Sequence, residues 1–211
     1  MDELGIMTHR YDPVAFCLQE VMLPENGAIN IRRFSNYIKL PNNNDRPSGG
    51  VAILVPSNTP HSRIRLYTNL QAVAIRVSLH KTITLCSLYL PPNSAVEKHE
   101  LQDLLRQLPR PAVVCGDFNA HNPLWWSSHI TPRGKIIEDL IAEEDFSLLN
   151  DGSATYIHPA NGSQSNIDLT ICHPNIYLDL KWNTVKDTHG SDHYPVLVSF
   201  AKPHKQEKLP Q

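Results

Sequence analysis

An apolar run that ends in closely spaced polar residues, Val113-Val114-Cys115-Gly116-Asp117-Phe118-Asn119, constrains the fold of this chain most. A short, continuous apolar run of this kind is typical of a strand buried on both faces of a sheet. Side chains alternate between the two faces of a strand, so Asp117 and Asn119 are predicted to point the same way. The stretch therefore predicts either a polar turn or a site where a carboxylate and an amide orient one water molecule at a strand end.

The composition fits one globular domain with a sizeable core, because 41% of the 211 residues are hydrophobic and 19% are charged. We expect a domain over residues 1–201 and a polar tail over 202–211. The net charge of −2 neither requires nor excludes nucleic acid as a partner. The four cysteines lie in apolar runs without a C-x-x-C pair, which predicts buried free thiols in a reducing, intracellular compartment. No stretch approaches the roughly 20 apolar residues of a membrane span, so no membrane partner is expected.

Short strands outnumber helices in the predicted secondary structure. Apolar or alternating runs predict strands at residues 14–18, 37–40, 51–55, 63–67, 72–79, 82–89, 113–116, 147–149, 155–157, 167–172, 178–185 and 194–200. The strand at 14–18 is continuously apolar, which predicts burial on both faces. Many adjacent strands with few helices predict an α/β fold in which two sheets form a sandwich flanked by helices.

Helices are predicted where apolar residues recur at helical spacing behind a capping residue. Residues 1–11 carry such spacing. Ser94 followed by Glu97 forms a capping-box pattern and predicts a helix that runs to about Leu108. Thr131-Pro132 predicts the start of another helix, since proline suits the first helical position.

Polar residues lie at the ends of several of the predicted strands. They are Glu20, Tyr89, Asp117, Asn119, Asp168, Asp192 and His193. Each alone is more readily explained as a surface acid, an aromatic lid, a turn partner or a core histidine. Together, carboxylates, an amide and a histidine without cysteines suit a hard cation such as Mg²⁺, with Mn²⁺ as a substitute. Phosphate ester hydrolysis uses such a set: the metal neutralises phosphate charge, a carboxylate prepares water, and a histidine held by an acid stabilises the transition state.

Two motifs, Gly116-Asp117-Phe118-Asn119 and Ser191-Asp192-His193, resemble the paired motifs of the endonuclease/exonuclease/phosphatase superfamily. Within it, the chain is most similar to the endonuclease domain of non-LTR (LINE-type, jockey-like) retrotransposons. Supporting pieces are Gln19-Glu20, the stretch 87–92, the stretch 119–125 and Ser165-Asn166-Ile167-Asp168. The resemblance covers roughly residues 12–200 and implies a DNase I-like four-layer fold.

The resemblance implies how the metal and the water would be handled. Glu20 would be the main metal ligand, and Asp192 would assist at the metal site. Asp117 would polarise or deprotonate the attacking water. Asn119 would orient that water and contact the substrate.

The resemblance also implies how the phosphate would be bound. Tyr89 would donate a hydrogen bond to the scissile phosphate, and His193 would stabilise the transition state while Asp168 holds its imidazole. Thr155 and Ser191 would lie near the DNA backbone and bind substrate. The implied activity is nicking of DNA in the nucleus, leaving a 3′-hydroxyl that primes reverse transcription. A reverse transcriptase domain, expected in a full-length element, is absent from this sequence.

The chain departs from the family pattern near its start. The family begins with a strand that ends in an asparagine ligand, whereas the 19 residues before Glu20 contain no asparagine. We therefore expect an amino-terminally truncated fold with an open sheet edge and reduced activity. The alternatives are an inactive retroelement remnant, or a phosphatase or phosphodiesterase acting on a small phosphorylated substrate. The stretch 165–167 lacks the Trp-Cys-Asp-Arg type sequence of inositol phosphatases, which disfavours that second alternative.

Overall fold

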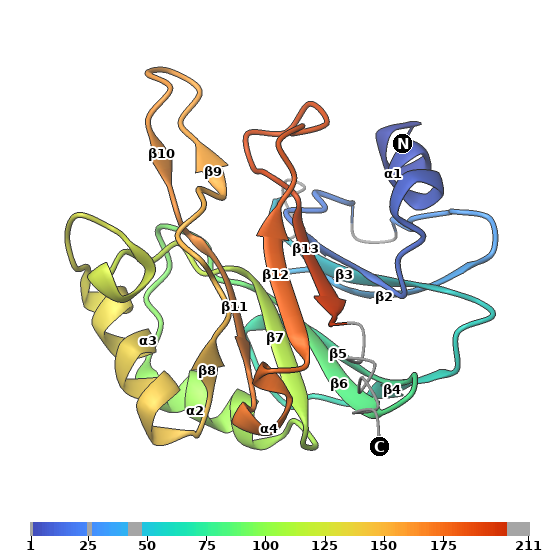
Figure 1. Ribbon diagram of the computed structural model, residues 1–211, viewed down its shortest axis with the longest axis horizontal. Coiled ribbons are helices and arrows are strands. Elements are labelled where there is room, and N and C mark those ends of the chain that lie inside the picture. Colours follow the sequence, from blue (N-terminus) through green and yellow to red (C-terminus); the bar gives the residue numbers. More distant parts are fainter. Residues whose placement is uncertain (1, 25–26, 42–47, 202–211) are drawn as a thin grey trace, which may run out of the picture.

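Two layers of β-sheet pack face to face, and two helices cover the outer face of one layer (Figure 1). The computed structural model describes residues 2–24, 27–41 and 48–201, so the expected tail at 202–211 lies outside the described residues. The larger layer is one six-stranded sheet. In spatial order, its strands are β4 (His61–Ile64), β5 (Gln71–Ser78), β6 (Thr82–Tyr89), β7 (Ala112–Asp117), β11 (Asp168–Cys172) and β8 (Ser147–Leu148). β6 and β7 run parallel, and the other neighbours run antiparallel.

The second layer consists of two separate sheets. One contains β1 (Phe16–Gln19), β3 (Val51–Pro56) and β2 (Phe34–Lys39) in that order, and the other pairs β12 (Leu180–Thr184) with β13 (Val196–Phe200). β9 (Tyr156–Ile157) and β10 (Gln164–Ser165) form a hairpin that projects from the sandwich (Figure 1). Within the described ranges, β1 pairs with β3 alone and is an open edge of its sheet.

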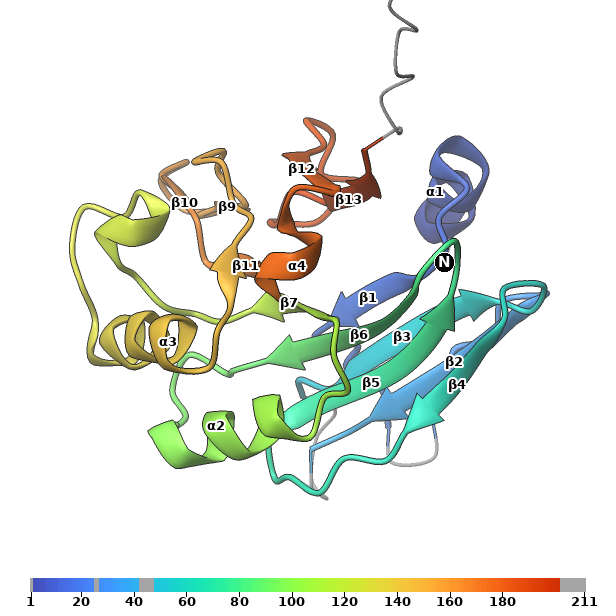
Figure 2. The same cartoon turned by 60° about the horizontal axis from the view of Figure 1, so that its bottom comes forward.

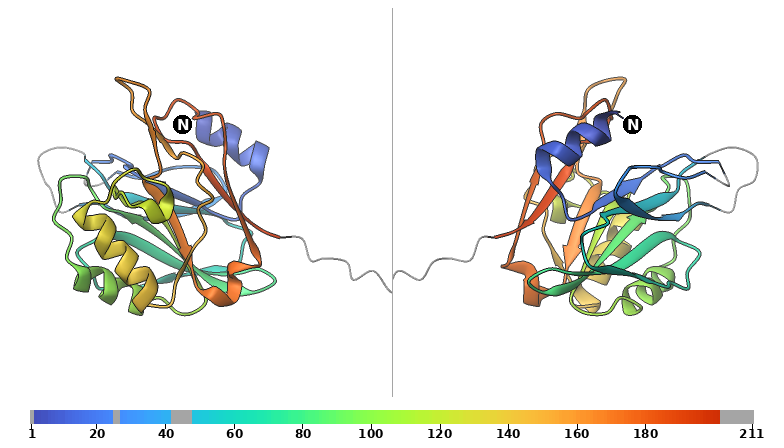
Figure 3. Two further views of the ribbon diagram at one scale, coloured as in Figure 1. Left: turned by 60° about the vertical axis from the view of Figure 1, so that its left-hand side comes forward. Right: turned by 90° about the vertical axis from the view of Figure 1, so that its right-hand side faces the viewer.

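Two helices cover the outer face of the six-stranded sheet (Figure 2). Leucines of α2 (Lys98–Arg106) and aliphatic residues of α3 (Pro132–Glu143) pack in one buried cluster with side chains of β6, β7 and β11. The parallel β6–β7 pair needs such a crossover, and α2 supplies it. α1 (Asp2–Tyr11) lies instead beside the second layer, near the β12–β13 connection (Figure 3). A single-turn helix α4 (Pro174–Tyr177) and the 3₁₀ turn η1 (Pro123–Trp125) complete the helical elements.

The structure confirms the two-sheet α/β sandwich flanked by helices and corrects two local predictions. Glu97, not Ser94, is the N-cap of α2, and its N–H donates to the Glu100 carboxylate at 3.1 Å. The Ser94 hydroxyl is engaged elsewhere, because it donates to the Pro91 carbonyl at 2.8 Å. Every residue of β1 is partly exposed rather than buried on both faces, because β1 is an edge strand. No helix of the described ranges is long and apolar enough to cross a membrane.

The four cysteines are free, as the sequence predicts, but only two of them are buried. Cys86 and Cys172 lie in the core, whereas Cys17 and Cys115 are partly exposed and line a cavity between the two halves of the second layer. Burial, rather than a charged partner, is the principal cause that raises the pKa of the Cys172 thiol to about 11. A thiol with a raised pKa is a poor nucleophile, so Cys172 contributes packing rather than chemistry.

Candidate active site

Three of the predicted site residues stand in one row across neighbouring strands of the large sheet. Tyr89 at the end of β6 is the register partner of Asp117 at the end of β7. Asp117 is in turn the cross-strand partner of Asp168, the first residue of β11. Directly opposed residues project from the same face of a sheet. The register therefore brings Tyr89, Asp117 and Asp168 together although they are far apart in the sequence.

The turn after β7 fixes the carboxylate of Asp117. Gly116 is required before it, because a Cβ there would lie 1.8 Å from the Leu88 carbonyl oxygen of β6. Asn119 adopts a left-handed backbone with φ of 46°, a conformation that asparagine tolerates better than most residues. Its N–H donates to Asp117 Oδ1 at 2.9 Å, and its side-chain amide donates to Oδ2 at 2.7 Å. Asp117 is only 3% exposed, and Asn119 donates a hydrogen bond to each of its two carboxylate oxygens.

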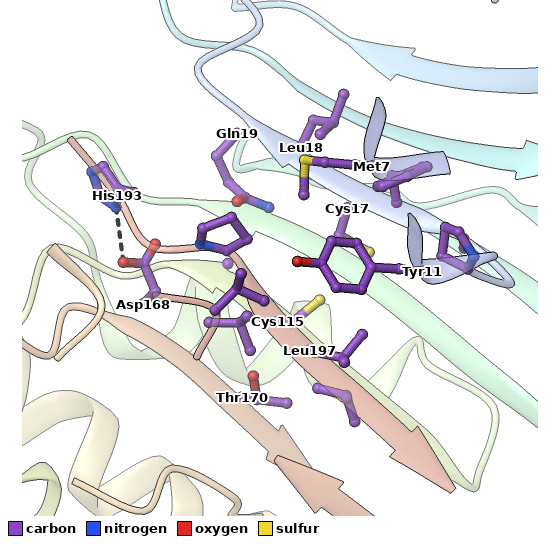
Figure 4. A pocket seen from close by; sticks show the side chains of 18 of the residues that line it. Met7, Tyr11, Cys17, Leu18, Gln19, Cys115, Asp168, Thr170, His193 and Leu197 are labelled. Atoms are coloured by element: carbon purple, nitrogen blue, oxygen red, sulfur yellow. Dashed lines mark hydrogen bonds and ion pairs between the residues drawn. The ribbon is translucent and has the colours of Figure 1, made fainter. Parts of the chain in front are cut away.

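His193 is held by Asp168 from the neighbouring strand. Nδ1 of the imidazole and Asp168 Oδ2 are 2.8 Å apart (Figure 4). An Nδ1–H that donates to a carboxylate leaves Nε2 to face the cavity. The Ser191 hydroxyl accepts from the His193 N–H at 3.0 Å, and the Tyr156 ring lies 4.9 Å from the imidazole, centroid to centroid. These contacts of Ser191 and Tyr156 fix the position of His193 within the β12–β13 connection.

Thr155 lies inside the protein rather than at the surface, with a side chain that is 0% exposed. Its hydroxyl accepts from the N–H groups of Ile167 and Asp168, at 3.2 Å and 3.0 Å. Asn150 supports the same segment, because its side-chain amide donates to the Asp168 carbonyl at 2.9 Å. In this arrangement Thr155 positions the backbone of Asp168, and its side chain is not presented to a ligand outside.

Glu20 reaches the same site from the second layer. It directly follows β1, is exposed, and has a left-handed backbone with φ of 49°. The Tyr89 hydroxyl donates to its carboxylate and so links the two layers. Asp192 is exposed on the β12–β13 connection. Glu20, Asp117, Asp168, Asp192 and His193 all line one cavity.

Burial and neighbouring carboxylates raise the proton affinity of Asp117. Burial is the largest cause that raises the pKa of Asp117, to about 7, and the charges of Asp168 and Glu20 raise it further. Burial opposes the charged form of His193, yet the hydrogen bond and charge of Asp168 outweigh it and bring the His193 pKa to about 9. Burial and the bond to Glu20 also raise the Tyr89 pKa, which keeps this hydroxyl a proton donor.

The donor set fits a hard divalent cation that retains water ligands. Mg²⁺ is usually held by one or two carboxylates plus waters and substrate phosphate. Glu20 and Asp192 both line the cavity and offer oxygen donors, and the repulsion that Asp168 and Glu20 exert on Asp117 would fall beside a cation. Over residues 2–24, 27–41 and 48–201, no group of three or more His, Cys, Asp or Glu side chains is arranged to hold a metal by itself.

Arg133 is a site-supporting residue that the sequence analysis missed. Its guanidinium donates to the carbonyls of Leu90, Phe118 and Asn119 at 3.1–3.2 Å, and to those of Pro91 and Ser94 at 2.8 Å and 2.6 Å. It thereby ties the loops that follow β6 and β7, which carry Tyr89 and Asn119. Burial lowers the Arg133 pKa. The sequence did carry one signal for this role. Arg133 lies in the first turn of α3, where a positive charge is unfavourable beside the helix dipole unless another group binds it.

Comparison with known proteins agrees with this architecture. A family model described as endonuclease-reverse transcriptase matches residues 83–197. The chain is 27% identical over 207 residues to the RNA-directed DNA polymerase from mobile element jockey of Drosophila funebris, covering 94% of this chain and 22% of that protein. The jockey polymerase of Drosophila melanogaster is 30% identical over 172 residues, covering 79% of this chain and 18% of its own length. The chain thus spans about a fifth of the length of these relatives.

A solved structure shares the fold over nearly all of the chain. It is the endonuclease domain of TRAS1, a telomere-specific non-LTR retrotransposon, with a TM-score of 0.79 and 21% identity. The match covers 96% of this chain and 92% of that domain. The predicted DNase I-like class is confirmed by this fold and by the family match. This chain belongs to the endonuclease-reverse transcriptase family.

Proposed function

We propose that this chain is a metal-dependent endonuclease domain that nicks DNA, in the nucleus, at the target site of a non-LTR retrotransposon. The observation that carries the proposal is one cavity lined by Asp117, Asp168 and His193, at which two halves of a hydrolytic site meet. Asp117 and Asn119 form one half, and Asp168 and His193 form the other. Membership of the endonuclease-reverse transcriptase family supports phosphodiester bonds as the target.

Asp117 is the group proposed to activate the water. Its carboxylate is buried and its pKa of about 7 is close to neutral pH, which suits a general base. Asn119 holds this carboxylate through two hydrogen bonds and orients the water that it activates. Arg133 keeps the Asn119 loop in place through the carbonyls that it binds.

His193 is proposed to stabilise the negative charge that develops on the phosphate. Asp168 holds Nδ1 and favours the imidazolium, so Nε2–H is available as a donor toward the cavity. The Tyr89 hydroxyl stays protonated and donates to Glu20 in this structure; it would become a second donor to the phosphate on turning away from that carboxylate. For Thr155 we propose a positioning role beneath Asp168, and for Ser191 a role in shaping the His193 backbone.

Glu20 and Asp192 are the residues proposed to hold Mg²⁺, with Mn²⁺ as a substitute. When bound, the cation would neutralise phosphate charge and lower the cost of nucleophilic attack. The left-handed backbone of Glu20 turns its carboxylate toward Tyr89 rather than along β1. A conformation that costs energy and also aims a polar group is characteristic of functional sites.

Nicking of supercoiled plasmid tests the proposal. The purified chain is incubated with Mg²⁺, with Mn²⁺ or with EDTA, and the nicked product is then offered to a DNA polymerase. We expect nicking that requires the cation and leaves extendable 3′-hydroxyl ends. The variant His193→Ala should lose nicking, whereas His99→Ala, an exposed histidine of α2, should retain it.

Three results would contradict the proposal. Folded protein that never nicks DNA, even at high concentration, would favour a catalytically inactive remnant. Phosphate release from small phosphorylated substrates without nicking would favour a phosphatase. Equal nicking by His193→Ala and by the original chain would indicate a contaminating nuclease.

A further inference from the structure

A closed loop, residues 121–131, follows the site strand β7. His121 and Thr131 close it, because the Thr131 N–H donates to the His121 carbonyl at 2.9 Å and the His121 N–H donates to the Thr131 hydroxyl at 3.1 Å. The loop begins two residues beyond Asn119 of the site, and it stands beside the β9–β10 hairpin (Figure 1, Figure 2). Compact loops whose ends lie close together are frequently functional.

Two consecutive tryptophans of this loop have opposite environments. Trp125 is completely buried, and its indole N–H donates to the Ala120 carbonyl at 3.0 Å. Trp126 is 59% exposed. Asn122 ties the loop to α3, because its buried side-chain amide donates to the Gly134 carbonyl at 3.3 Å. Trp125 therefore anchors the loop, and Trp126 is presented to solvent from a fixed position.

The backbone of Trp126 has an unfavourable conformation. Its φ of 62° lies in the left-handed region, where a bulky residue is an outlier and glycine is not. The indole rests on Gly152, where a Cβ would come within 3.0 Å of ring atoms Cδ2 and Cε2. A strained residue that also exposes a large apolar ring lowers stability. Strain of this kind is concentrated at functional sites and ligand contacts.

Asn166 places this tryptophan next to the candidate active site. Its side-chain amide donates to the carbonyls of Trp125 and Gly152, at 3.2 Å each. Asn166 lies two residues before Asp168, a separation that spans at most about 7 Å of extended chain. Successive nucleotides of one DNA strand are about 3.4 Å apart along the helix axis. A strand bound at Asp168 therefore brings bases a few nucleotides from the cut within reach of Trp126.

The chemistry of this surface suits a base better than a phosphate. Residues 119–132 and 145–180, which include the loop and the β9–β10 hairpin, contain no lysine or arginine to pair with the DNA backbone. A planar indole stacks on the face of any base without needing a charge. One such stack changes affinity about 5- to 150-fold.

We propose that Trp126 stacks on an unpaired or easily unstacked DNA base a few nucleotides from the bond that is cut. The inference rests on the proposed function and specifies which DNA is preferred. In a regular duplex, neighbouring base pairs cover the faces of each base. A mismatched or unpaired base exposes its face at the lowest energetic cost, and flexible pyrimidine–purine steps unstack readily. Trp126 is thus a specificity-determining residue that favours distorted or deformable DNA.

Tryptophan fluorescence of the full chain in EDTA tests the contact without cleavage. Trp126 is the exposed tryptophan of the three, since Trp125 and Trp182 are 0% and 8% exposed. The probe is a short DNA duplex with one unpaired base, and the control is the same duplex fully paired. We expect the probe to quench the emission and to shield it from acrylamide. Anisotropy of labelled DNA should show binding of the paired duplex at least about fivefold weaker.

Trp126→Gly separates a DNA contact from a structural role. Glycine accepts the left-handed backbone, so this variant should not have a lower urea midpoint than the original chain. It should bind the probe at least about fivefold more weakly, with an unchanged salt dependence, because stacking releases no counterions. Trp126→Phe keeps an aromatic ring and should retain most of the affinity. Tyr177→Ala, an exposed aromatic of α4 beyond the opposite end of β11 from Asp168, should bind as the original chain does.

The outcomes distinguish this inference from the proposed function. Equal binding of the probe by Trp126→Gly and the original chain, or equal quenching by both duplexes, would overturn the inference even if plasmid is nicked. A lower urea midpoint with equal loss of affinity for both duplexes would assign the indole a structural role instead. Emission that changes with protein concentration in the absence of DNA would identify a second copy as the occupant. Quenching by the probe without any nicking of plasmid would contradict the proposed function and support the base contact.

Discussion

Asp117→Asn should stabilise the metal-free protein at alkaline pH while it removes the proposed general base. In the folded protein the Asp117 pKa is raised from 3.8 to about 7, first by burial and then by Asp168. Between these values the folded state holds a proton that the unfolded state has released, so the stability of the original chain falls as pH rises. At about 1.36 kcal/mol per pKa unit, ionisation of Asp117 lowers the free energy of unfolding above pH 7 by roughly 4 kcal/mol in total.

Asp117→Asn also destabilises the folded state by disturbing a hydrogen bond. This loss limits the expected net gain in the free energy of unfolding. One of the two Asp117 oxygens that accept from Asn119 becomes an amide, and a lost or unsatisfied hydrogen bond costs about 1–3 kcal/mol. The net gain at pH 8 is therefore on the order of 1–3 kcal/mol. At pH 4 the gain should vanish, and the variant should be the less stable protein.

Urea denaturation in EDTA, measured from pH 4 to pH 8, provides the assay. Asp103→Asn, at an exposed position on α2, changes the same formal charge and serves as the control. A stability difference between Asp117→Asn and the original chain that stays constant over this pH range would refute the reasoning. So would an Asp117→Asn variant that is less stable at pH 8.

Three further substitutions have defined outcomes. Asp168→Asn should lower the His193 pKa in EDTA from about 9 by roughly two units, because burial then acts unopposed by this partner; an NMR titration that still gives about 9 would contradict it. Gly116→Ala should destabilise the chain by about 3 kcal/mol or more, since its Cβ would lie 1.8 Å from the Leu88 carbonyl oxygen; an unchanged urea midpoint would exclude so close an approach. Arg133→Met removes the guanidinium donor of the part-buried Phe118 and Asn119 carbonyls and should cost about 2 kcal/mol or more, together with slower nicking; unchanged stability and nicking would show that these bonds are dispensable.

The sequence predicted those parts of the site that depend on local patterns. Asp117 and Asp168 were placed at strand ends because short apolar runs mark buried strands, and the structure adds the register that makes them neighbours. The start of α2 was misplaced because two overlapping capping-box patterns, Ser94 with Glu97 and Glu97 with Glu100, fit the same stretch. Only the tertiary fold decides between them.

Other features depend on contacts that no local pattern records. Thr155 was expected at the DNA backbone, yet its complete burial follows from the way the segment before β9 packs beneath Asp168. Arg133 binds backbone carbonyl groups, which every residue carries. The residue types along the sequence therefore do not indicate which positions are its partners. The partial exposure of β1 follows from its place at a sheet edge rather than from its apolar sequence.

The site gathers residues from almost the whole length of the chain, from Glu20 to His193. Contacts between such distant positions form only after long loops have closed, which slows folding and makes it strongly cooperative. A polypeptide that stops before His193 carries the water-activating half of the site without the histidine. Under the proposed function, incomplete products of translation or proteolysis would be inert, and only a molecule that has folded to its last strand would cleave DNA.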